Sequence, residues 1–299
     1  MKQIAIIGGG AVGLLYSAYL GKHFNVTLYT RTAEQAEQIK EKGITLIKGE
    51  YKQQVAIYAQ KLEKKIKAVD IIIVAVKQYH LSHILPYLKE VPQHTPILFI
   101  QNGMKHLSII ESLINETLLL GVVEHGALKV DASTVEHTGV GLTRIGLYKG
   151  SFSQAEFVLH MDENSSFLFK KELDWKEILV RKLVINAIIN PLTAIYRVKN
   201  GELTTNPAFL NNMNQLFSEI SAVLHLNEEK VYWEAVVDVC NKTANNYSSM
   251  LKDVLNGKST EIDAILGYIL EEATRRQVNV PLTYFLYHSI KGLENKERE

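Results

Sequence analysis

Cysteine is almost absent from this chain of 299 residues, since Cys240 is the only one. A single cysteine excludes a disulfide within the chain and a cysteine-based metal cluster. This usage fits a reducing compartment, so we expect a cytoplasmic protein. An excess of charge of one sign is also lacking, because 33 basic and 32 acidic side chains leave a formal net charge of +1. We therefore expect neither a nucleic-acid partner nor an acidic membrane surface.

Long apolar runs are missing as well. No uncharged apolar stretch reaches the roughly 20 residues that cross a bilayer, so we expect no membrane span. The apolar N-terminus is interrupted at Gly8, Gly9 and Gly10, and it lacks a cleavage signature, which argues against a signal peptide. The remaining composition, 46% hydrophobic and 22% charged, is ordinary for a globular protein. The length suits two domains.

A glycine pattern follows the first apolar segment. Residues 1–7 predict a strand, apolar residues from Leu14 to Leu20 recur at helical spacing, and G-x-G-x-x-G lies between them. In dinucleotide folds the first glycine permits the tight turn, the second lets backbone approach the pyrophosphate, and the third lets the helix pack on the strand. The alternative is an ordinary glycine turn in another α/β protein. The pattern predicts that a nicotinamide or flavin dinucleotide binds at Gly8, Gly9, Gly10, Ala11, Val12 and Gly13.

Strands and helices alternate through the first half of the chain. Strands are predicted at 25–30, 69–76, 96–100 and 118–123, with a helix at 32–42 and one or two short strands within 44–59. Such alternation predicts a parallel, doubly wound sheet of the Rossmann type. Ligands of these sheets bind beyond the carboxyl ends of the strands. Lys77, Asn102 and the segment at His125 are site candidates for that reason.

The second half of the chain has a different pattern of predicted secondary structure. Residues 135–148, which contain several glycines, predict a hairpin, and 157–161 predict one more strand. From about residue 171 helical patterns dominate, at 174–195, 207–224, 228–244, 260–275 and 282–292. We expect an α/β cofactor-binding domain over residues 1–166 and an all-α substrate and catalytic domain over 167–299, with the transition at 162–166.

The tip of the second predicted strand indicates which cofactor binds. NAD-specific folds place an acid there for the ribose 2′-hydroxyl, whereas a nearby arginine suits a 2′-phosphate. Here the strand ends Leu28-Tyr29-Thr30-Arg31, without an acid. Arg31, with Lys77 as additional charge, therefore favours NADPH over NADH and nicotinamide over flavin. The alternative is that Arg31 is an ordinary solvated arginine.

A polar stripe runs along the first long helix of the second half. Lys182, Asn186 and Asn190 are spaced i, i+4 and i+8, so they share one helical face within apolar surroundings. Buried polar groups need partners, so the stripe is either an internal network or part of a ligand site. Further along, Thr260 and Asp263 have capping-box spacing around Glu261. Glu261 is either a first-turn acid favoured by the helix dipole or a site carboxylate that positions Lys182.

These motifs together resemble the ketopantoate reductases (2-dehydropantoate 2-reductases) of vitamin B5 (pantothenate) synthesis. The resemblance covers nearly the whole chain and rests on motifs in the family's order. They are the glycine loop, Arg31, Val76-Lys77, Gln101-Asn102-Gly103, Gly139-x-Gly141 with Ile145-Gly146, Lys182-Leu-x-x-Asn186-x-x-x-Asn190-Pro191-Leu-Thr, Asn200-Gly201-Glu202-Leu203, Ser248-Ser249-Met250-Leu251-x-Asp253 and Thr260-Glu261-Ile262-Asp263.

The resemblance implies NADPH-dependent reduction of 2-dehydropantoate to (R)-pantoate. It implies that Lys182 is the proton donor and that Glu261 orients the substrate hydroxyl and the lysine. It also implies a nucleotide side and a substrate side. The nucleotide side comprises Gly8 to Gly13, Arg31, Lys77, Asn102 and Ala127, and the substrate side comprises Asn102, Lys182, Asn186, Asn190, Asn200, Asn246 and Ser249.

Two positions depart from the family pattern. Val180 replaces a common aromatic residue two before the lysine, and Lys252 replaces a common glutamine, which could alter the rim of the site. The alternatives left open are a reductase of another 2-oxo acid, an opine-type dehydrogenase on the same plan, and a non-catalytic NADPH-binding sensor. No metal is expected, since His125 and His137 lack ligand spacing. The exposed faces of the helical domain leave a homodimer open.

Overall fold

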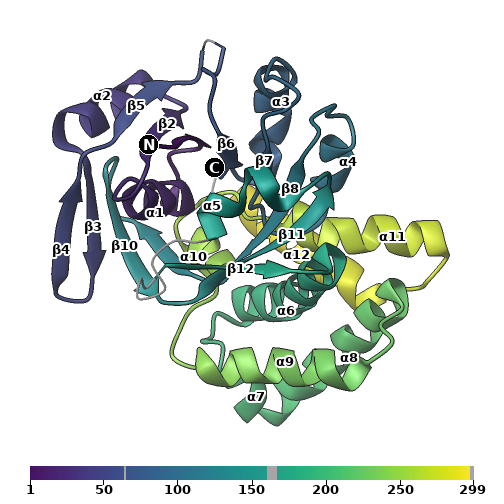
Figure 1. Cartoon of the computed structure of the whole chain (residues 1–299). Coiled ribbons are helices and arrows are strands. Elements are labelled where there is room, and N and C mark those ends of the chain that lie inside the picture. The colour runs from purple at the N-terminus through teal and green to yellow at the C-terminus, as the bar shows by residue number, and fades with distance from the viewer. Residues whose placement is uncertain (64, 160–166, 297–299) are drawn as a thin grey trace. The chain divides into compact units, whose positions relative to one another are not determined.

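The structure is a computed structural model, and it describes residues 1–63, 65–159 and 167–296 (Figure 1). The chain divides into two compact units. The first comprises residues 1–101 and 107–178, and the second comprises residues 102–106 and 179–299. The predicted boundary after residue 166 adjoins residues 160–166, which lie outside the described residues together with the expected transition at 162–166. That boundary stays a prediction.

An eight-stranded sheet forms the centre of the first unit. Its strand order is β12-β11-β8-β7-β6-β1-β2-β5. The strands are β1 (Gln3–Ile7), β2 (Asn25–Thr30), β5 (Tyr58–Lys61), β6 (Ile71–Val74), β7 (Ile97–Phe99), β8 (Leu118–Val123), β11 (Leu142–Lys149) and β12 (Leu168–Glu172).

Six of these strands are parallel neighbours: β8, β7, β6, β1, β2 and β5. Numbered one to six in chain order, they lie in the order 3-2-1-4-5-6 of a Rossmann fold. Beyond them β11 runs antiparallel to β8, and β12 runs parallel to β11. Strands β1 and β6 are rich in isoleucine and, apart from Gln3, buried, as expected for the middle of a parallel sheet. The predicted α/β fold class is confirmed.

Helix α1 (Ala11–Leu20) contacts both sheets of the first unit. It touches β1 and β2 of the large sheet, and β3, β9 and β10 of a second sheet. That sheet has the order β4-β3-β10-β9 and is built from β3 (Ile44–Lys48), β4 (Tyr51–Val55), β9 (Gly126–Lys129) and β10 (Thr134–Gly139). Because both sheets cover α1, eight of its ten residues are buried, from Gly13 to Leu20.

The other helices of the first unit are short or peripheral. They are α2 (Ala33–Lys42), η1 (Gln78–His80), α3 (Leu81–Lys89), α4 (Leu107–Ile110), η2 (Phe152–Gln154) and α5 (Glu156–Leu159). Helix α2 begins where Thr32 Oγ1 accepts a hydrogen bond from Gln35 N at 3.3 Å. It ends at Gly43, whose φ is +71°. Both ends are set by local residues, which explains why the predicted helix at 32–42 nearly matches the bounds of α2.

Three sequence predictions for the first unit were wrong. Residues 135–148 form no hairpin, because β10 pairs with β3 and β9 while β11 pairs with β8 and β12. The glycines at 139 and 141 mark a crossing between sheets. The segment 44–61 contains three strands instead of one or two. In the predicted strand at 157–161, residues 157–159 are helical and belong to α5. Strand propensity depends strongly on the surrounding structure, so it is a weak guide for a short segment. Residues 160–161 lie outside the described residues.

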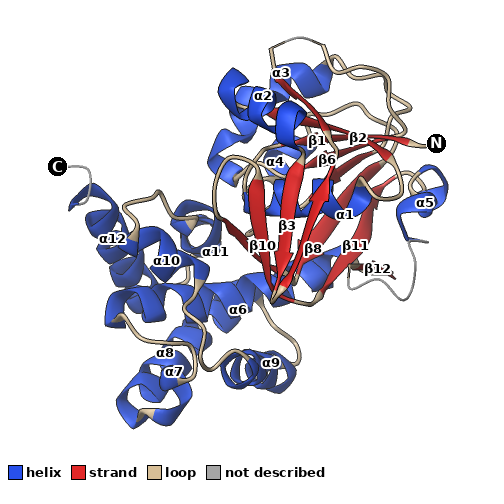
Figure 2. Cartoon of the chain, turned by 90° about the vertical axis from the view of Figure 1, so that its left-hand side faces the viewer, coloured by secondary structure: helices blue, strands red, loops and turns tan. Residues whose placement is uncertain are grey.

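The second unit consists of helices, and Figure 2 shows strands only in the first unit among the described residues. Helix α6 (Trp175–Tyr196) begins in the first unit and continues into the second. The others are α7 (Glu202–Thr205), α8 (Pro207–Leu224), α9 (Glu229–Lys242), α10 (Ser249–Leu255), η3 (Asp263–Gly267), α11 (Tyr268–Arg276) and α12 (Pro281–Lys296). The five long helical predictions are confirmed with shifted ends, and η3 is a π-helix.

Helix α6 is long and apolar enough to cross a membrane by length and composition. However, 72% of its most apolar window is buried inside the protein, and a core helix passes the same test. Leu183, Val184, Ala187 and Ile188 are fully buried. An apolar helix that the protein covers on most sides is the core of its unit.

Candidate functional site

The glycine turn of the first unit has the geometry of a phosphate cradle. Gly8 has φ of +120°, and a Cβ there would lie 2.9 Å from the carbonyl carbon of Ala75 at the end of β6. A Cβ on Gly13 would lie 1.8 Å from the Gly8 carbonyl oxygen, so only glycine lets α1 come this close. A Cβ on Gly10 would meet nothing within 4 Å. The space beside Gly10 is where a pyrophosphate can approach the backbone.

The N-terminus of α1 faces this space. Gly10 is the N-cap residue, no side chain caps the helix, and its first turn carries no acid. The backbone N–H groups of Ala11 and Val12 begin the helix, and such groups with the helix dipole favour an anion. The Gly9 carbonyl is held by Gln35 Nε2 at 2.8 Å and by Lys129 Nζ at 2.9 Å. These contacts fix the loop conformation, and the residues present fit a dinucleotide pyrophosphate.

Positive charge gathers at the ends of β2 and β6. Arg31 is exposed directly after β2, and Lys77 follows β6. The pKa of His80 in η1 is lowered, first by burial and then by Arg31, His83 and Lys77. The charges of Arg31 and Lys77 thus act on a common region. An arginine with neighbouring cations suits a phosphate better than a bare ribose hydroxyl.

The predicted polar stripe lies on α6 of the second unit. Lys182 is half-buried, while Asn186 and Asn190 are 8% and 7% exposed. One turn later, Thr193 Oγ1 donates to Ser248 Oγ at 2.7 Å, and Ser248 in turn caps α10 by accepting from Leu251 N at 3.1 Å. This contact brings the start of α10, and with it Ser249, to the Asn190 end of α6.

A recess lies at that meeting point, which we call the Glu261 recess. It is lined by Asn190, Ser249, Met250, Asp253, Glu261 and Ile265, and it is too narrow to hold a water molecule. Three of the predicted site residues, Asn190, Ser249 and Glu261, are therefore together. Lys182 lies two helical turns before Asn190 and is not one of the lining residues. Asp253 lines the recess and was missed as a site residue, although it lies one turn after Ser249.

Asn102 reaches the same carboxylate from a distant part of the sequence. Its Nδ2 donates to Glu261 Oε2 at 2.9 Å. The next residue, Gly103, has φ of +76°, and a Cβ there would lie 2.1 Å from the Ala264 carbonyl oxygen. Met104 N donates to that oxygen at 3.4 Å, and Lys105 pairs with Glu271 on α11. The segment 102–106 is thus bound to the chain around η3, and only glycine permits the close approach.

The remaining predicted residues are not among those that line the recess. Asn200 uses Nδ2 to donate to Thr243 Oγ1 at 2.8 Å, and its backbone N–H donates to the carbonyl of Asn246, whose side chain is exposed. Ala127 is in β9 of the smaller sheet, two residues before Lys129. Lys129 contacts the glycine loop and was missed, because nothing local in the sequence connects β9 with residue 9.

His125 and His137 contact each other inside the first unit. Their Nδ1 and Nε2 atoms are 3.2 Å apart, and the Tyr19 hydroxyl lies 2.7 Å from His137 Nδ1. Burial, followed by the charge of His137, lowers the pKa of His125 to about 4, so His125 is neutral at pH 7, and burial also lowers the pKa of His137. Over residues 1–63, 65–159 and 167–296, no three His, Cys, Asp or Glu side chains group to hold a metal.

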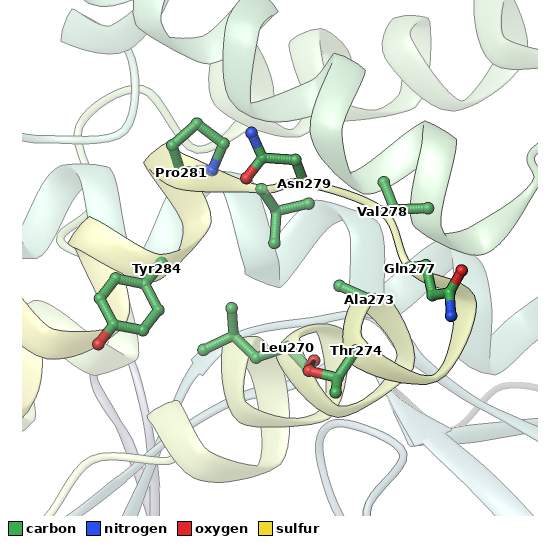
Figure 3. Close-up of a pocket in the computed structure, with 9 residues that line it drawn as sticks. Leu270, Ala273, Thr274, Gln277, Val278, Asn279, Pro281 and Tyr284 are labelled. Carbon is green, nitrogen blue, oxygen red and sulfur yellow. Dashed lines mark hydrogen bonds between the residues drawn. The ribbon is translucent and has the colours of Figure 1, made fainter.

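A wider pocket of about 530 Å³ lies at the turn between α11 and α12 (Figure 3). Its lining residues are Leu270, Ala273, Thr274, Gln277, Val278, Asn279, Val280, Pro281 and Tyr284. None of them is a lysine, histidine or carboxylate. The pocket therefore lacks the acid–base groups that the Glu261 recess and α6 provide.

Two family models match the chain. Residues 4–150 match the model described as ketopantoate reductase PanE/ApbA, and residues 174–294 match ketopantoate reductase PanE/ApbA C terminal. The 2-dehydropantoate 2-reductase of Bacillus subtilis (strain 168) is 40% identical over 294 residues, which cover 98% of this chain and 97% of that protein. That of Listeria monocytogenes (strain EGD-e) is 39% identical with the same coverages.

Solved structures agree with this assignment. The crystal structure of a probable 2-dehydropantoate 2-reductase from Bacillus subtilis superposes with a TM-score of 0.90 at 40% identity, covering 97% of this chain and 99% of the other. A ternary structure of D-mandelate dehydrogenase with NADH and anilino(oxo)acetate superposes with a TM-score of 0.87 at 24% identity, covering 99% of this chain and 100% of the other. At this identity the likeness shows the fold alone. From the two family models and these full-length relatives, the chain belongs to the ketopantoate reductase family.

Proposed function

We propose that this enzyme uses NADPH to reduce 2-dehydropantoate to (R)-pantoate, with Lys182 as proton donor and Glu261 as the carboxylate that orients the substrate. It is an oxidoreductase of the ketopantoate reductase family, and ketopantoate reduction is the activity that the names of its curated relatives state. The structural observation that carries the proposal is the Glu261 recess, which joins Asn190, Ser249 and Glu261, together with the Asn102 bond to Glu261.

The first unit supplies what a nicotinamide dinucleotide needs. Gly8 to Gly13 would hold the pyrophosphate, and Arg31 with Lys77 would bind the 2′-phosphate, because a guanidinium matches phosphate geometry and no acid stands at the tip of β2. Ala127 and Asn102 complete the proposed nucleotide side. When bound, the cofactor supplies a hydride to the ketone carbon.

The second unit supplies the groups that act on the substrate. Negative charge develops on the ketone oxygen during reduction, so a cation at that oxygen stabilises the transition state more than the ground state. Lys182 Nζ would bind this oxygen and give it a proton, which leaves an alcohol and a neutral lysine. Glu261 accepts from Asn102 Nδ2 through Oε2, and its carboxylate would accept a further hydrogen bond from a substrate hydroxyl.

The asparagines of α6 would hold the substrate. Asn186 and Asn190 are buried amides on the Lys182 face, and amides both donate and accept hydrogen bonds. Ser249 would contribute a hydroxyl from α10, and Asn200 and Asn246 would line the site from the loops that bond to each other. We also propose a cytoplasmic enzyme with the domains at 1–166 and 167–299. Homodimer formation through the helical domain stays a prediction.

Oxidation of reduced nicotinamide in the presence of a panel of 2-oxo acids tests this function. Ketopantoate with NADPH should give the highest kcat/KM, above pyruvate, 2-oxoisovalerate and phenylglyoxylate with either nicotinamide. A higher kcat/KM for another 2-oxo acid would support the alternative reductase. Absence of turnover with every acid, with NADPH binding intact, would support the sensor.

A further inference from the structure

The backbone that carries Glu261 is held on both sides by α12. On one side, Thr260 donates to Glu294 Oε1 from its backbone N and from Oγ1, each at 2.6 Å. On the other side, Asp263 accepts from the Tyr287 hydroxyl at 2.7 Å and from Lys291 Nζ at 3.2 Å. Glu261 lies between these two attachments.

Lys291 connects the two attachments. Its Nζ lies 3.2 Å from Asp263 Oδ2 and 3.1 Å from Glu294 Oε2. Glu294 is only 9% exposed, so its carboxylate is a buried charge, and it contacts Thr260 and Lys291. Burying a carboxylate is costly, and well-packed apolar residues commonly stabilise a fold as well as a buried ion pair does. These bonds fix the positions of Thr260 and Asp263 relative to α12.

The local helix fixes this segment only in part, through Thr260 Oγ1, which accepts from Ile262 N at 3.2 Å. Thr260 and Asp263 have the spacing of a capping box, but the Thr260 backbone N–H is bound by Glu294, 34 residues later. The helix that follows is the π-helix η3, and both Ala264 N and Ile265 N donate to the Glu261 carbonyl, at 3.0 and 3.2 Å. Irregular turns of this kind are held by contacts outside the segment, and π-bulges are frequent at functional sites.

We propose that Glu294 is a positioning residue, which fixes Thr260 and thereby orients Glu261 toward the substrate. This inference rests on the substrate-binding role proposed above for Glu261. Glu294 does not line the Glu261 recess and contacts Thr260 and Lys291, so it acts through Thr260 and the backbone. Small displacements of a binding carboxylate are expensive in rate, because the productive geometry must be held tightly.

Two matched pairs of variants test the proposal. Glu294→Ala and Thr260→Val each remove hydrogen bonds of the attachment, whereas Glu294→Gln keeps an oxygen acceptor and Thr260→Ser keeps the hydroxyl. We expect Glu294→Ala and Thr260→Val to lower kcat/KM for ketopantoate by about 10- to 100-fold, chiefly through KM, because misplacement by about 1 Å has such effects. Thr260→Ser should restore most of the activity. The Kd for NADPH, measured by fluorescence quenching, should not change in any folded variant.

A double-variant cycle with Glu261→Gln separates this proposal from the function proposed above. If Glu294 acts through Glu261, adding Glu294→Ala to Glu261→Gln should lower kcat/KM no further.

A full additional loss of kcat/KM in the double variant, or weaker NADPH binding, would show a general structural effect and overturn the proposal. Wild-type kcat/KM in Glu294→Ala and Thr260→Val, with a loss in Glu261→Gln, would overturn positioning and leave the function standing. Wild-type activity in Glu261→Gln would overturn both. Should Glu294→Ala fail to fold, the Thr260→Val and Thr260→Ser pair decides by the same criteria.

Discussion

Asn102 and Glu261 are 159 positions apart in the chain and are joined by a hydrogen bond of 2.9 Å. The bond depends on the neighbouring Gly103, which lies against the Ala264 carbonyl with positive φ. The Asn102 amide and the Glu261 carboxylate therefore form one hydrogen-bonded pair within the second unit of the structure.

Gly103→Ala should destabilise the protein more than Gly49→Ala. Both glycines have positive φ, +76° and +56°, so each alanine carries a backbone penalty of about 1–2 kcal/mol. The new Cβ at residue 49 would meet nothing within 4 Å, whereas at residue 103 it would lie 2.1 Å from the Ala264 oxygen. Urea unfolding midpoints measure the difference. Equal midpoints for the two variants would mean that the segment 102–106 shifts to accommodate the new Cβ without a loss of stability.

Lys182→Ala should lose most of kcat while NADPH still binds. General-acid assistance is worth about 10²- to 10⁴-fold in rate, and the alanine has no proton to give. Steady-state kinetics and NADPH binding by fluorescence are the measurements. Arg181→Ala is the control, because Arg181 is the exposed basic neighbour on the same helix. Near wild-type turnover in Lys182→Ala would remove this residue from the mechanism.

Arg31→Ala should raise KM for NADPH much more than KM for NADH. The guanidinium is exposed beyond β2, and a charge-assisted hydrogen bond to a 2′-phosphate contributes about 1.5–3 kcal/mol, or about 10- to 100-fold in affinity. NADH lacks the phosphate, so its binding should change little. Lys67→Ala, at another exposed basic residue of the same unit, is the control. Equal changes in KM for both cofactors would contradict 2′-phosphate recognition by Arg31.

Gly10→Ala and Gly13→Ala should fail in different ways. A Cβ on Gly10 enters open space beside the N-terminus of α1, so this variant should fold normally and bind NADPH weakly. A Cβ on Gly13 would collide with the Gly8 carbonyl, so that variant should unfold at lower urea concentration. Thermal melts and NADPH titration distinguish the two. Unchanged cofactor affinity in Gly10→Ala would place the pyrophosphate elsewhere.

His106 should make stability fall in acid. The side chain is completely buried, both ring nitrogens lack a hydrogen-bond partner among the described residues, and burial lowers its pKa from 6.5 to about 4. Between these values the unfolded chain binds the proton and the folded protein does not, so the free energy of unfolding decreases as pH falls from 6.5 to 4. The loss is at most about 3 kcal/mol.

Replacing His106 tests that linkage directly. His106→Leu should flatten the decrease in unfolding free energy between pH 6.5 and 4, although part remains because the pKa of His125 is lowered similarly. His94→Leu, at an exposed histidine, should leave the slope unchanged. Urea unfolding at several pH values provides the measurement, and an unaltered slope in His106→Leu would assign the acid sensitivity to other groups.

Local patterns predicted the elements whose partners are close in sequence or whose faces are strongly periodic. Helix α8 is an example, because Asn206 caps it, Pro207 begins it, and both signals are local. The stretch 135–148 was predicted wrongly because glycines look the same in a hairpin and at a crossing between sheets. Only the pairing of β11 with the distant β8 decides between them.

The candidate site divides in the same way. Lys182, Asn186 and Asn190 share a face through helical periodicity alone, and the glycine turn follows from its position between a strand and a helix. Nothing local predicted that Asn102 meets Glu261 or that Glu294 binds Thr260, because these contacts close over 159 and 34 residues. The family resemblance named Asn102 and Glu261 as site residues, but it gave Asp253 no role in the site and did not name Lys129.

The assignment of residues 102–106 to the second unit has a consequence for synthesis of the chain. Asn102 and Met104 emerge from the ribosome long before Glu261 and Ala264, to which they respectively bond. At roughly 5–20 residues per second, the gap is on the order of ten to thirty seconds. Throughout that time the loop after β7 lacks its hydrogen-bond partners, Glu261 and Ala264. Contacts that span so much sequence are also those that slow folding, so maturation of the Glu261 site should be a late event in the life of each new molecule.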